Sequence, residues 1–201
     1  MKIGFIGLGN VGGKLAGSLV RNGENLSVHD LNQSFVDDFV GRGAKNGVSA
    51  QHLMQTCDVV ITCLPTPEAS SAVVTEMLPY VEPGKVWMEM STTDASEVKR
   101  LSAQVMEAGG EAVDCPVSGG CHRADTGNIS IYAGCGRETF EKVLPLLTHM
   151  GQSILHVGDV GTASLLKVMT NYLATANLVT VCEALTLSLI HISEPTRPSQ
   201  I

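Results

Sequence analysis

A glycine-rich turn near the N-terminus constrains the fold of this chain more than any other feature. The turn directly follows a short apolar run, opens a helical pattern, and fits G-x-G-x-x-G as Gly7-Leu8-Gly9-Asn10-Val11-Gly12. In such a strand–turn–helix the first glycine permits a tight turn, the second lets a pyrophosphate approach the backbone, and the third allows close packing. The N-terminus of the helix offers N–H groups to the phosphates. We therefore expect these six residues to bind a dinucleotide.

A carboxylate at the end of the next apolar run indicates which dinucleotide binds. Residues 26–30 are predicted as the second strand, and Asp30 ends it. A carboxylate in this place accepts hydrogen bonds from ribose hydroxyls and repels a 2′-phosphate. No arginine follows directly, since the next residues are Leu31 and Asn32. We expect NAD as the cofactor, with NADP disfavoured; the alternative is a structural turn with a chance aspartate.

Apolar, β-branched runs alternate with helical patterns through the first 160 residues. Beyond the first two strands, further strands are predicted at 58–64, 85–90, 111–114, 128–134 and 153–157. Helices are predicted through Leu15 and Leu19, through Phe35 and Phe39, and at about 68–78, 95–108, 137–149 and 162–187. Strands buried on both faces and joined by helices form a mostly parallel sheet. The fold class is therefore α/β, with a doubly wound Rossmann-type domain over residues 1–160.

The last predicted helix differs from the others because it is longer and apolar nearly all round. Such a helix needs partners on several sides, and few residues remain to supply them. We expect residues 161–188 to form an interdomain helix, the start of an otherwise missing all-helical domain. Residues 189–201 contain two prolines and are expected to be a disordered or artefactual tail. Because the helix contains Glu183, it is expected to fall short of a membrane span.

Composition narrows the possible partners. The chain has 13 basic and 20 acidic residues, a net charge of −7, and no basic run for a nucleic-acid backbone. Its six cysteines lack the spacing of a zinc or thioredoxin-like site, so we expect reduced thiols and no metal. The glycine-broken N-terminus does not resemble a signal peptide. We expect a soluble, cytoplasmic protein with neither a nucleic-acid nor a membrane partner.

Two further motifs carry polar groups. After the strand that ends at Asp114, the turn Ser118-Gly119-Gly120 presents a hydroxyl and adjacent N–H groups that suit a carboxylate. By itself it is more often a structural turn. Lys167 and Asn171 are four residues apart, on one helix face, within an apolar segment. A desolvated lysine there would have a lowered pKa and would exchange protons near neutral pH, although a lysine reaching to solvent is the commoner case.

Taken together, these motifs resemble the β-hydroxyacid dehydrogenases, the family of 3-hydroxyisobutyrate dehydrogenase and tartronate semialdehyde reductase, over residues 1 to about 188. Leu64-Pro65 resembles the family's cofactor-contacting Leu-Pro, and Ser91-Thr92 its Ser-Thr beside the nicotinamide. The turn at residues 118–120 resembles its substrate-carboxylate signature. Lys167 and Asn171 match its catalytic lysine and the asparagine that holds the substrate.

The resemblance implies hydride transfer between nicotinamide and the hydroxyl-bearing carbon of a small 3-hydroxy acid. Lys167 would act as general base or acid and Asn171 would orient the substrate, a carboxylate-bearing hydroxy acid or semialdehyde. Ser118, Gly119 and Gly120 would bind its carboxylate, and Leu64, Pro65 and Thr92 would contact the cofactor. The resemblance also implies a homo-oligomer and a helical C-terminal domain, so we expect a C-terminally truncated, inactive chain.

Departures from the family pattern keep alternatives open. The family commonly has two consecutive asparagines where this chain has Thr170-Asn171, and members differ where this chain has Cys121-His122-Arg123. A relative of 6-phosphogluconate dehydrogenase would have histidine before the asparagine and would prefer NADP, whereas imine reductases usually lack the lysine. A non-catalytic NAD-binding remnant is the alternative from another class. The substrate, the direction of reaction and the oligomeric state are left open.

Overall fold

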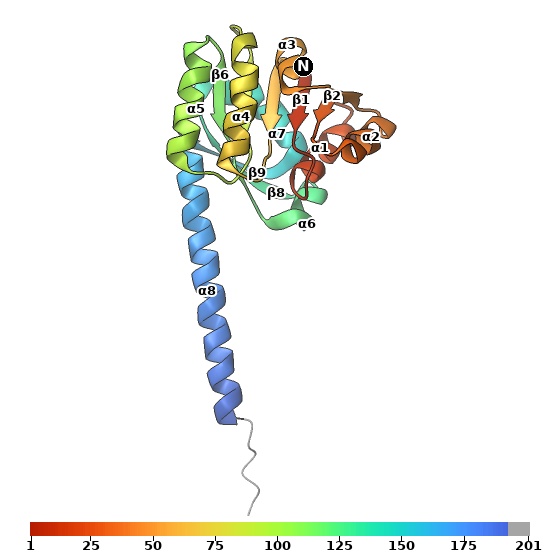
Figure 1. Ribbon diagram of the computed structural model, residues 1–201. Coiled ribbons are helices and arrows are strands. Elements are labelled where there is room, and N and C mark those ends of the chain that lie inside the picture. The colour runs from red at the N-terminus through yellow and green to blue at the C-terminus, as the bar shows by residue number, and fades with distance from the viewer. Residues whose placement is uncertain (193–201) are drawn as a thin grey trace, which may run out of the picture. The chain divides into compact units, whose positions relative to one another are not determined.

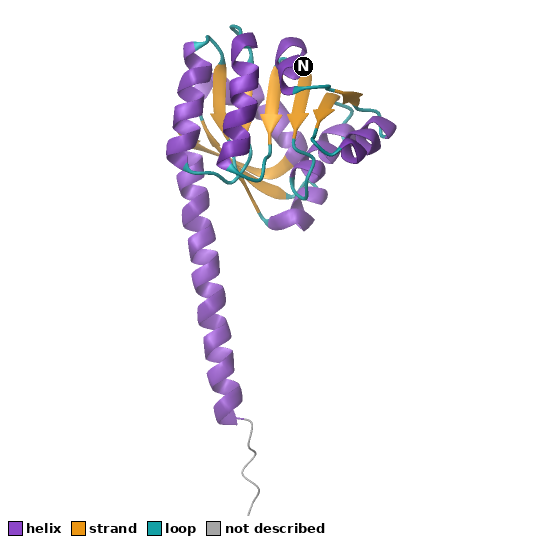
Figure 2. Ribbon diagram, viewed as in Figure 1, coloured by secondary structure: helices purple, strands orange, loops and turns teal. Residues whose placement is uncertain are grey.

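The computed structural model describes residues 1–192, with side chains up to residue 190. It divides into two units, Met1–Lys167 and the segment from Val168 onward. The first unit contains all the described strands and is an α/β domain with helices on both faces of one sheet (Figures 1 and 2). The predicted boundary at residue 160 lies seven residues before this division. Residues 193–201 of the expected tail lie outside the described residues.

One twisted sheet contains the nine described strands, in the order β3-β2-β1-β4-β5-β6-β8-β7, with β9 beside β8. From β3 to β6 every neighbouring pair is parallel, which confirms the predicted doubly wound sheet. Beyond β6 the direction reverses: β8 is antiparallel to β6 and to β7, and β9 is parallel to β8. The strands are β1 (Lys2–Ile6), β2 (Asn25–His29), β3 (Lys45–Asn46), β4 (Val59–Thr62), β5 (Val86–Glu89), β6 (Glu111–Asp114), β7 (Val117–Ser118), β8 (Ile129–Gly134) and β9 (Gly151–Gly158).

Most of the connecting helices begin at side chains that cap them. Asn32, Ser49, Thr66 and Asp94 each accept a hydrogen bond from a backbone N–H in the first turn of the helix that follows, which stabilises the start of each helix. The helices of the first unit are α1 (Gly12–Arg21), α2 (Gln33–Gly41), α3 (Ala50–Thr56), α4 (Pro67–Met77), α5 (Ala95–Glu107), α6 (Gly120–Asp125) and α7 (Arg137–Met150), with a short 3₁₀ turn at Leu78–Tyr80.

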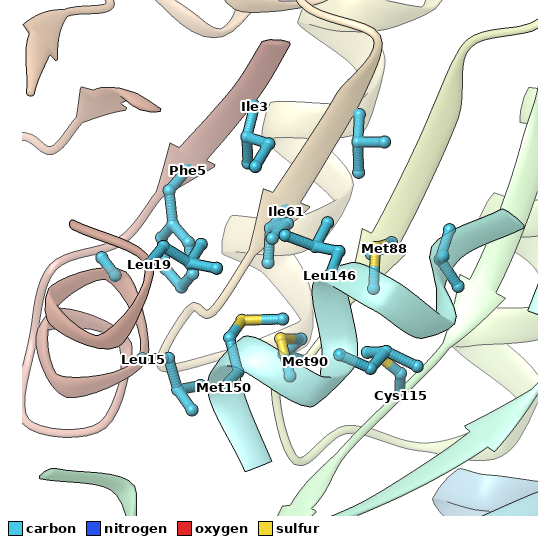
Figure 3. Close-up of a cluster of buried hydrophobic side chains, with 14 of the residues drawn as sticks. Ile3, Phe5, Leu15, Leu19, Ile61, Met88, Met90, Cys115, Leu146 and Met150 are labelled. Carbon is cyan, nitrogen blue, oxygen red and sulfur yellow. The ribbon is translucent and has the colours of Figure 1, made fainter. Parts of the chain in front are cut away.

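Two hydrophobic clusters hold these helices against the sheet because alternate strand residues face opposite sides. On one face, side chains of β1, β4 and β5 pack against α1, α2 and α7, as the close-up of Phe5, Ile61 and Met88 shows (Figure 3). On the other face, Val60 and Trp87 pack against α3, α4 and α5. In Figure 2, α4 and α5 cross in front of the strands. The central strands β1, β4 and β5 are therefore buried on both faces, which leaves the ends of these strands available for a binding site.

The sequence did not predict the shortest elements. Strands β3 and β7 have two residues each, and helices α3 and α6 have seven and six, too few for a hydrophobic period to be recognised. Helix α8 (Thr162–Ile192) continues beyond the predicted end near residue 187. Residues 189–192, expected in the tail, are helical, and no proline lies within Thr162–Ile192 to end the helix earlier.

The second unit, as far as the structure describes it, is the greater part of α8. Its apolar side chains are exposed around the helix; Leu173, Leu178 and Leu185 each have more than half of their surface accessible. By length and composition alone, Thr162–Ile190 is long and apolar enough to cross a membrane, because an 18-residue window within it has a mean hydropathy of 1.7. The expectation that this stretch falls short of a span is therefore wrong, although core helices of soluble proteins meet the same criterion.

Candidate nucleotide-binding and active site

The glycine loop between β1 and α1 shows why three of its positions are glycine. Gly7 has a φ of +96°, and a Cβ there would collide with the carbonyl oxygen of Cys63. A Cβ at Gly12 would collide with the carbonyl oxygen of Gly7. Gly9 differs, because a Cβ there would meet nothing within 4 Å. Two glycines are thus required by the fold, whereas Gly9 opens the loop to the space where a phosphate would approach.

Asp30 lies beside this loop, one residue beyond β2. Its Oδ2 accepts a hydrogen bond from the Leu8 N–H at 2.6 Å, and its Oδ1 accepts one from the Asn32 N–H at 2.8 Å. It lines a pocket of about 300 Å³ that also includes Gly7 and Leu64. The other lining residues, which the sequence did not predict, are Ile6, His29, Leu31, Ala50, Ala69, Ala72, Val73 and Glu76. A mostly apolar pocket that includes the Asp30 carboxylate suits an adenine and its ribose.

A second pocket, of about 440 Å³, is lined by residues 9–12 of the glycine loop. It is formed where β4 and β5 end, at the carboxyl edge of the parallel strands, which is where ligands bind in open α/β sheets. Several predicted site residues line it together: Gly9, Asn10, Val11, Gly12, Leu64, Pro65, Thr92, Gly120 and Lys167. Cys63, Met90, Ser91, Val117 and Ile129 complete the lining.

Lys167 brings a titratable group to this second pocket. It lies on α8, in the first unit, and is half-buried. Burial lowers the pKa of Lys167 below its ordinary value, which is the direction expected for a desolvated ammonium. Cys63 is different, because burial and the nearby Glu89 raise the pKa of its thiol to about 12. Near neutral pH, Lys167 is thus the better suited of the two to exchange a proton.

Buried Asp114 fixes the start of the helix that carries Lys167. Its Oδ2 accepts hydrogen bonds from the N–H groups of Gly161 and Ser164, both at 2.9 Å. Its Oδ1 accepts one from the Ser164 hydroxyl at 2.6 Å. Burial raises the pKa of Asp114 and these hydrogen bonds oppose that rise. The C-terminal end of β6 is therefore tied to the first turn of α8, one turn before Lys167.

Four predicted residues lie elsewhere. The Leu8 side chain is buried in the core, so only its backbone faces Asp30. Ser118 and Gly119 precede Gly120 in the turn but do not line the pocket. Asn171 is exposed and belongs to the second unit, one helical turn after Lys167. The roles of all four residues stay predictions.

The pocket-lining residues that the sequence did not reveal are mostly apolar. Cys63 and Met90 directly follow β4 and β5. Their position at the carboxyl end of a parallel strand was the sequence feature that could have indicated a place in the pocket. Val117 and Ile129 reach the pocket through the antiparallel strands β7 and β8, a pairing that no local pattern indicated. Asp114 does not line the pocket, but it holds the helix that carries Lys167. The sequence did not indicate this role, since the hydrogen-bond partners of Asp114 are 47 and 50 residues away.

The fold and this site define a dinucleotide-binding domain. Residues 2–158 match the family described as the NAD binding domain of 6-phosphogluconate dehydrogenase. This chain belongs to that family. The NAD-dependent L-serine dehydrogenase of Pseudomonas aeruginosa is 35% identical over 191 residues, which cover 94% of this chain and 64% of that protein. The 2-(hydroxymethyl)glutarate dehydrogenase of Eubacterium barkeri is 33% identical, with the same coverage of both chains.

A solved structure of a 3-hydroxyisobutyrate dehydrogenase is similar over most of this chain. The 3-hydroxyisobutyrate dehydrogenase of Mycobacterium tuberculosis, determined with L-serine, superposes with a TM-score of 0.92 at 27% identity, covering 96% of this chain and 67% of that one. The predicted resemblance to the β-hydroxyacid dehydrogenases is confirmed, as is NAD for the domain. The chain spans about 64% of the length of the curated relatives that it matches.

Proposed function

We propose that this chain supplies the cofactor-binding part, and the catalytic lysine, of an NAD-dependent dehydrogenase acting on a small 3-hydroxy acid. The observation that carries the proposal is the position of Lys167, whose pKa is lowered, in the same pocket as the glycine loop. Bound NAD would supply the hydride acceptor. The protein would supply position and a proton acceptor.

The residues present fit this cofactor. The open surface at Gly9 and the start of α1 would receive the pyrophosphate. Asp30 would accept hydrogen bonds from the adenosine ribose, and its charge would disfavour a 2′-phosphate. Leu64, Pro65 and Thr92 would then lie along the nicotinamide half, in the pocket that contains Lys167.

Lys167 would take the proton from the substrate hydroxyl during oxidation and return it during reduction. The neutral amine is the base, so a lowered pKa increases the fraction able to act at a given pH. Gly120 lines the pocket and has a φ of +79°, so its N–H is a candidate donor to the substrate carboxylate, with Ser118 and Gly119. Asn171 would orient the reacting group.

The relatives support the substrate class but not one substrate. The compounds named for them, L-serine, 2-(hydroxymethyl)glutarate and 3-hydroxyisobutyrate, share a hydroxymethyl group next to the carbon that bears a carboxylate. We propose a 3-hydroxyisobutyrate-like acid for this protein. We further propose a cytoplasmic homo-oligomer, because the six cysteines are free and the apolar side chains of α8 are exposed. We propose no nucleic-acid partner, because the net charge is −7, and no membrane partner, since a second subunit would cover the same apolar side chains.

The test is formation of NADH from NAD with a panel of acids: 3-hydroxyisobutyrate, L-serine, glycerate, 3-hydroxypropionate and threonate. Turnover is measured on this chain and on a chimera with the C-terminal remainder of the Pseudomonas aeruginosa relative. We expect Lys167→Ala to abolish turnover in the active form while NADH still binds. The matched control is Lys142→Ala, because Lys142 contacts Gly84 and Glu111 and does not line the pocket. Cofactor binding without turnover of any acid would instead support a non-catalytic NAD-binding role.

A further inference from the structure

Glu89 is a buried carboxyl group to which the proposed reaction gives no role. It is the last residue of β5 and has no accessible surface. In the sheet it lies between Thr62 of β4 and Asp114 of β6. A buried carboxyl group without a cation is costly to charge, and burial raises the pKa of Glu89. A polar group that is costly to bury calls for an explanation beyond packing.

The hydrogen bonds of Glu89 lead into the pocket. Its Oε1 accepts a hydrogen bond from the Ser91 N–H at 2.9 Å, and the Ser91 hydroxyl also stabilises the charged form of the carboxyl group. Ser91 Oγ in turn accepts the Leu64 N–H at 2.7 Å. Ser91 and Leu64 both line the pocket that contains Lys167. One chain of hydrogen bonds therefore joins Glu89 to the loops that follow β4 and β5.

The other side of Glu89 is less well satisfied. Its Oε2 and the Ser70 Oγ on α4 are both buried without a hydrogen-bond partner at bonding distance, although the hydroxyls of Ser70 and Thr62 favour the charged form. The well-formed hydrogen bonds are thus on the side of the pocket. This asymmetry points to a task at Ser91 rather than to a general role in the core.

We propose that Glu89 is a positioning residue, which acts through Ser91 to hold the Leu64 and Ser91 loops as the wall of the nicotinamide half of the pocket. The inference rests on the proposed function, because that function assigns this half to the nicotinamide. Leu64 also lines the pocket beside Asp30. Glu89 itself does not line either pocket, so it touches neither cofactor nor substrate directly.

The test compares two ligands on the full chain. NADH would occupy both halves of the site, whereas ADP-ribose lacks the nicotinamide and would need only the glycine loop and the Asp30 side. We expect Glu89→Leu and Ser91→Ala to weaken NADH binding about tenfold, the scale of a lost hydrogen bond to a charged or buried partner. ADP-ribose binding should change by less than about twofold. Glu89→Gln keeps an acceptor for Ser91 and should bind NADH within about threefold of wild type.

Controls separate positioning from damage to the fold. Ser102→Ala removes another buried hydroxyl that has no hydrogen-bond partner, on α5 and outside the pocket, and should leave both affinities unchanged. If Glu89 acts through Ser91, the double variant Glu89→Leu/Ser91→Ala should bind NADH no more weakly than the poorer single variant. Should Glu89→Leu not fold, Glu89→Asp takes its place: the shorter side chain no longer reaches the Ser91 N–H at bonding distance, so it should weaken NADH binding and leave ADP-ribose binding unchanged.

The two ligands separate the role of Glu89 from the proposed function. Equal weakening of NADH and ADP-ribose, or unchanged NADH binding in the folded variants, would overturn the role of Glu89 while leaving the proposed function in place. Failure of the wild-type chain to bind either ligand would reject the proposed function itself. Additive effects in the double variant would show that Glu89 does not act through Ser91.

Discussion

Removing the Asp114 carboxylate should strongly destabilise the first unit and release the start of α8. Asp114→Ala leaves two backbone N–H groups and one hydroxyl, those of Gly161 and Ser164, without their acceptor in a buried place. Each unsatisfied buried donor costs about 1–3 kcal/mol. Water entering the space would recover part of this free-energy cost. The variant also no longer needs to desolvate a carboxylate when it folds, which offsets a further part. We expect a net loss of about 3–5 kcal/mol in the free energy of unfolding, close to that for removing one partner of a buried charged pair.

The assay is urea denaturation followed by circular dichroism, with two companion variants. Asp114→Asn keeps an oxygen for both N–H groups and an amide for the Ser164 hydroxyl, so it should cost only about 1 kcal/mol. Glu111→Ala, on the same strand, breaks a partly exposed pair with Lys142 and should cost at most about 1 kcal/mol. Hydrogen exchange should accelerate selectively at residues 161–167 in Asp114→Ala. A loss below about 1 kcal/mol in Asp114→Ala would refute the reasoning.

The pH dependence of these variants has a defined sign. Because the pKa of Asp114 is raised in the folded protein above its ordinary 3.8, the folded state keeps this proton to higher pH than the unfolded state. The stability that the protonated carboxyl group contributes is fully present below pH 3.8 and is lost as pH rises through the folded pKa. The difference in unfolding free energy between wild type and Asp114→Asn should therefore decrease across that window. A difference that increased with pH would contradict the direction of the shift.

The glycine loop, Asp30, Lys167 and α8 can each be tested separately. Gly12→Ala should abolish NADH binding in fluorescence titration, because its Cβ would collide with the Gly7 carbonyl; binding at wild-type strength would contradict this packing. NADH should bind more tightly than NADPH by at least about 1–2 kcal/mol, and equal affinities would remove the role assigned to Asp30. In the active form, the oxidation rate should rise with pH and level off above the lowered pKa of Lys167, and a profile that falls with pH would exclude the neutral amine as base. In light scattering the chain should self-associate through α8, whose apolar side chains are exposed, and Leu178→Glu should reduce association; a monodisperse wild-type monomer would contradict it.

Features set by near neighbours in the chain could be predicted from the sequence. The glycine loop, α1 and the position of Asp30 follow from a strand, a turn and a helix within thirty residues. The strand at Glu111–Asp114 was predicted with its observed ends. These elements depend on periodicity and turn chemistry, which a local window contains.

Features set by distant contacts could not be predicted. The approach of Asp114 to Ser164 closes a loop of 50 residues, and no local pattern announces it. The antiparallel pairing that brings Ile129 to the pocket has the same origin. In the sequence, Glu89 is a polar residue within an apolar run. Its burial beside β4 and its hydrogen bond with Ser91 depend on the pairing of β4 with β5, which the structure shows.

Asp30 has two roles, in the proposed choice of cofactor and in holding the glycine loop, and the second restricts which substitutions can change the first. The carboxylate that would select the ribose also holds the Leu8 N–H, and with it the glycine loop. A substitution that removes both oxygens, such as Asp30→Ala, would remove the repulsion of a 2′-phosphate but would also release the loop that receives the pyrophosphate of either cofactor. Asp30→Asn would remove the charge and keep one oxygen, which can accept from either Leu8 or Asn32 but does not replace both hydrogen bonds. A change of preference from NAD to NADP at position 30 is therefore limited to residues that keep an acceptor for the Leu8 N–H.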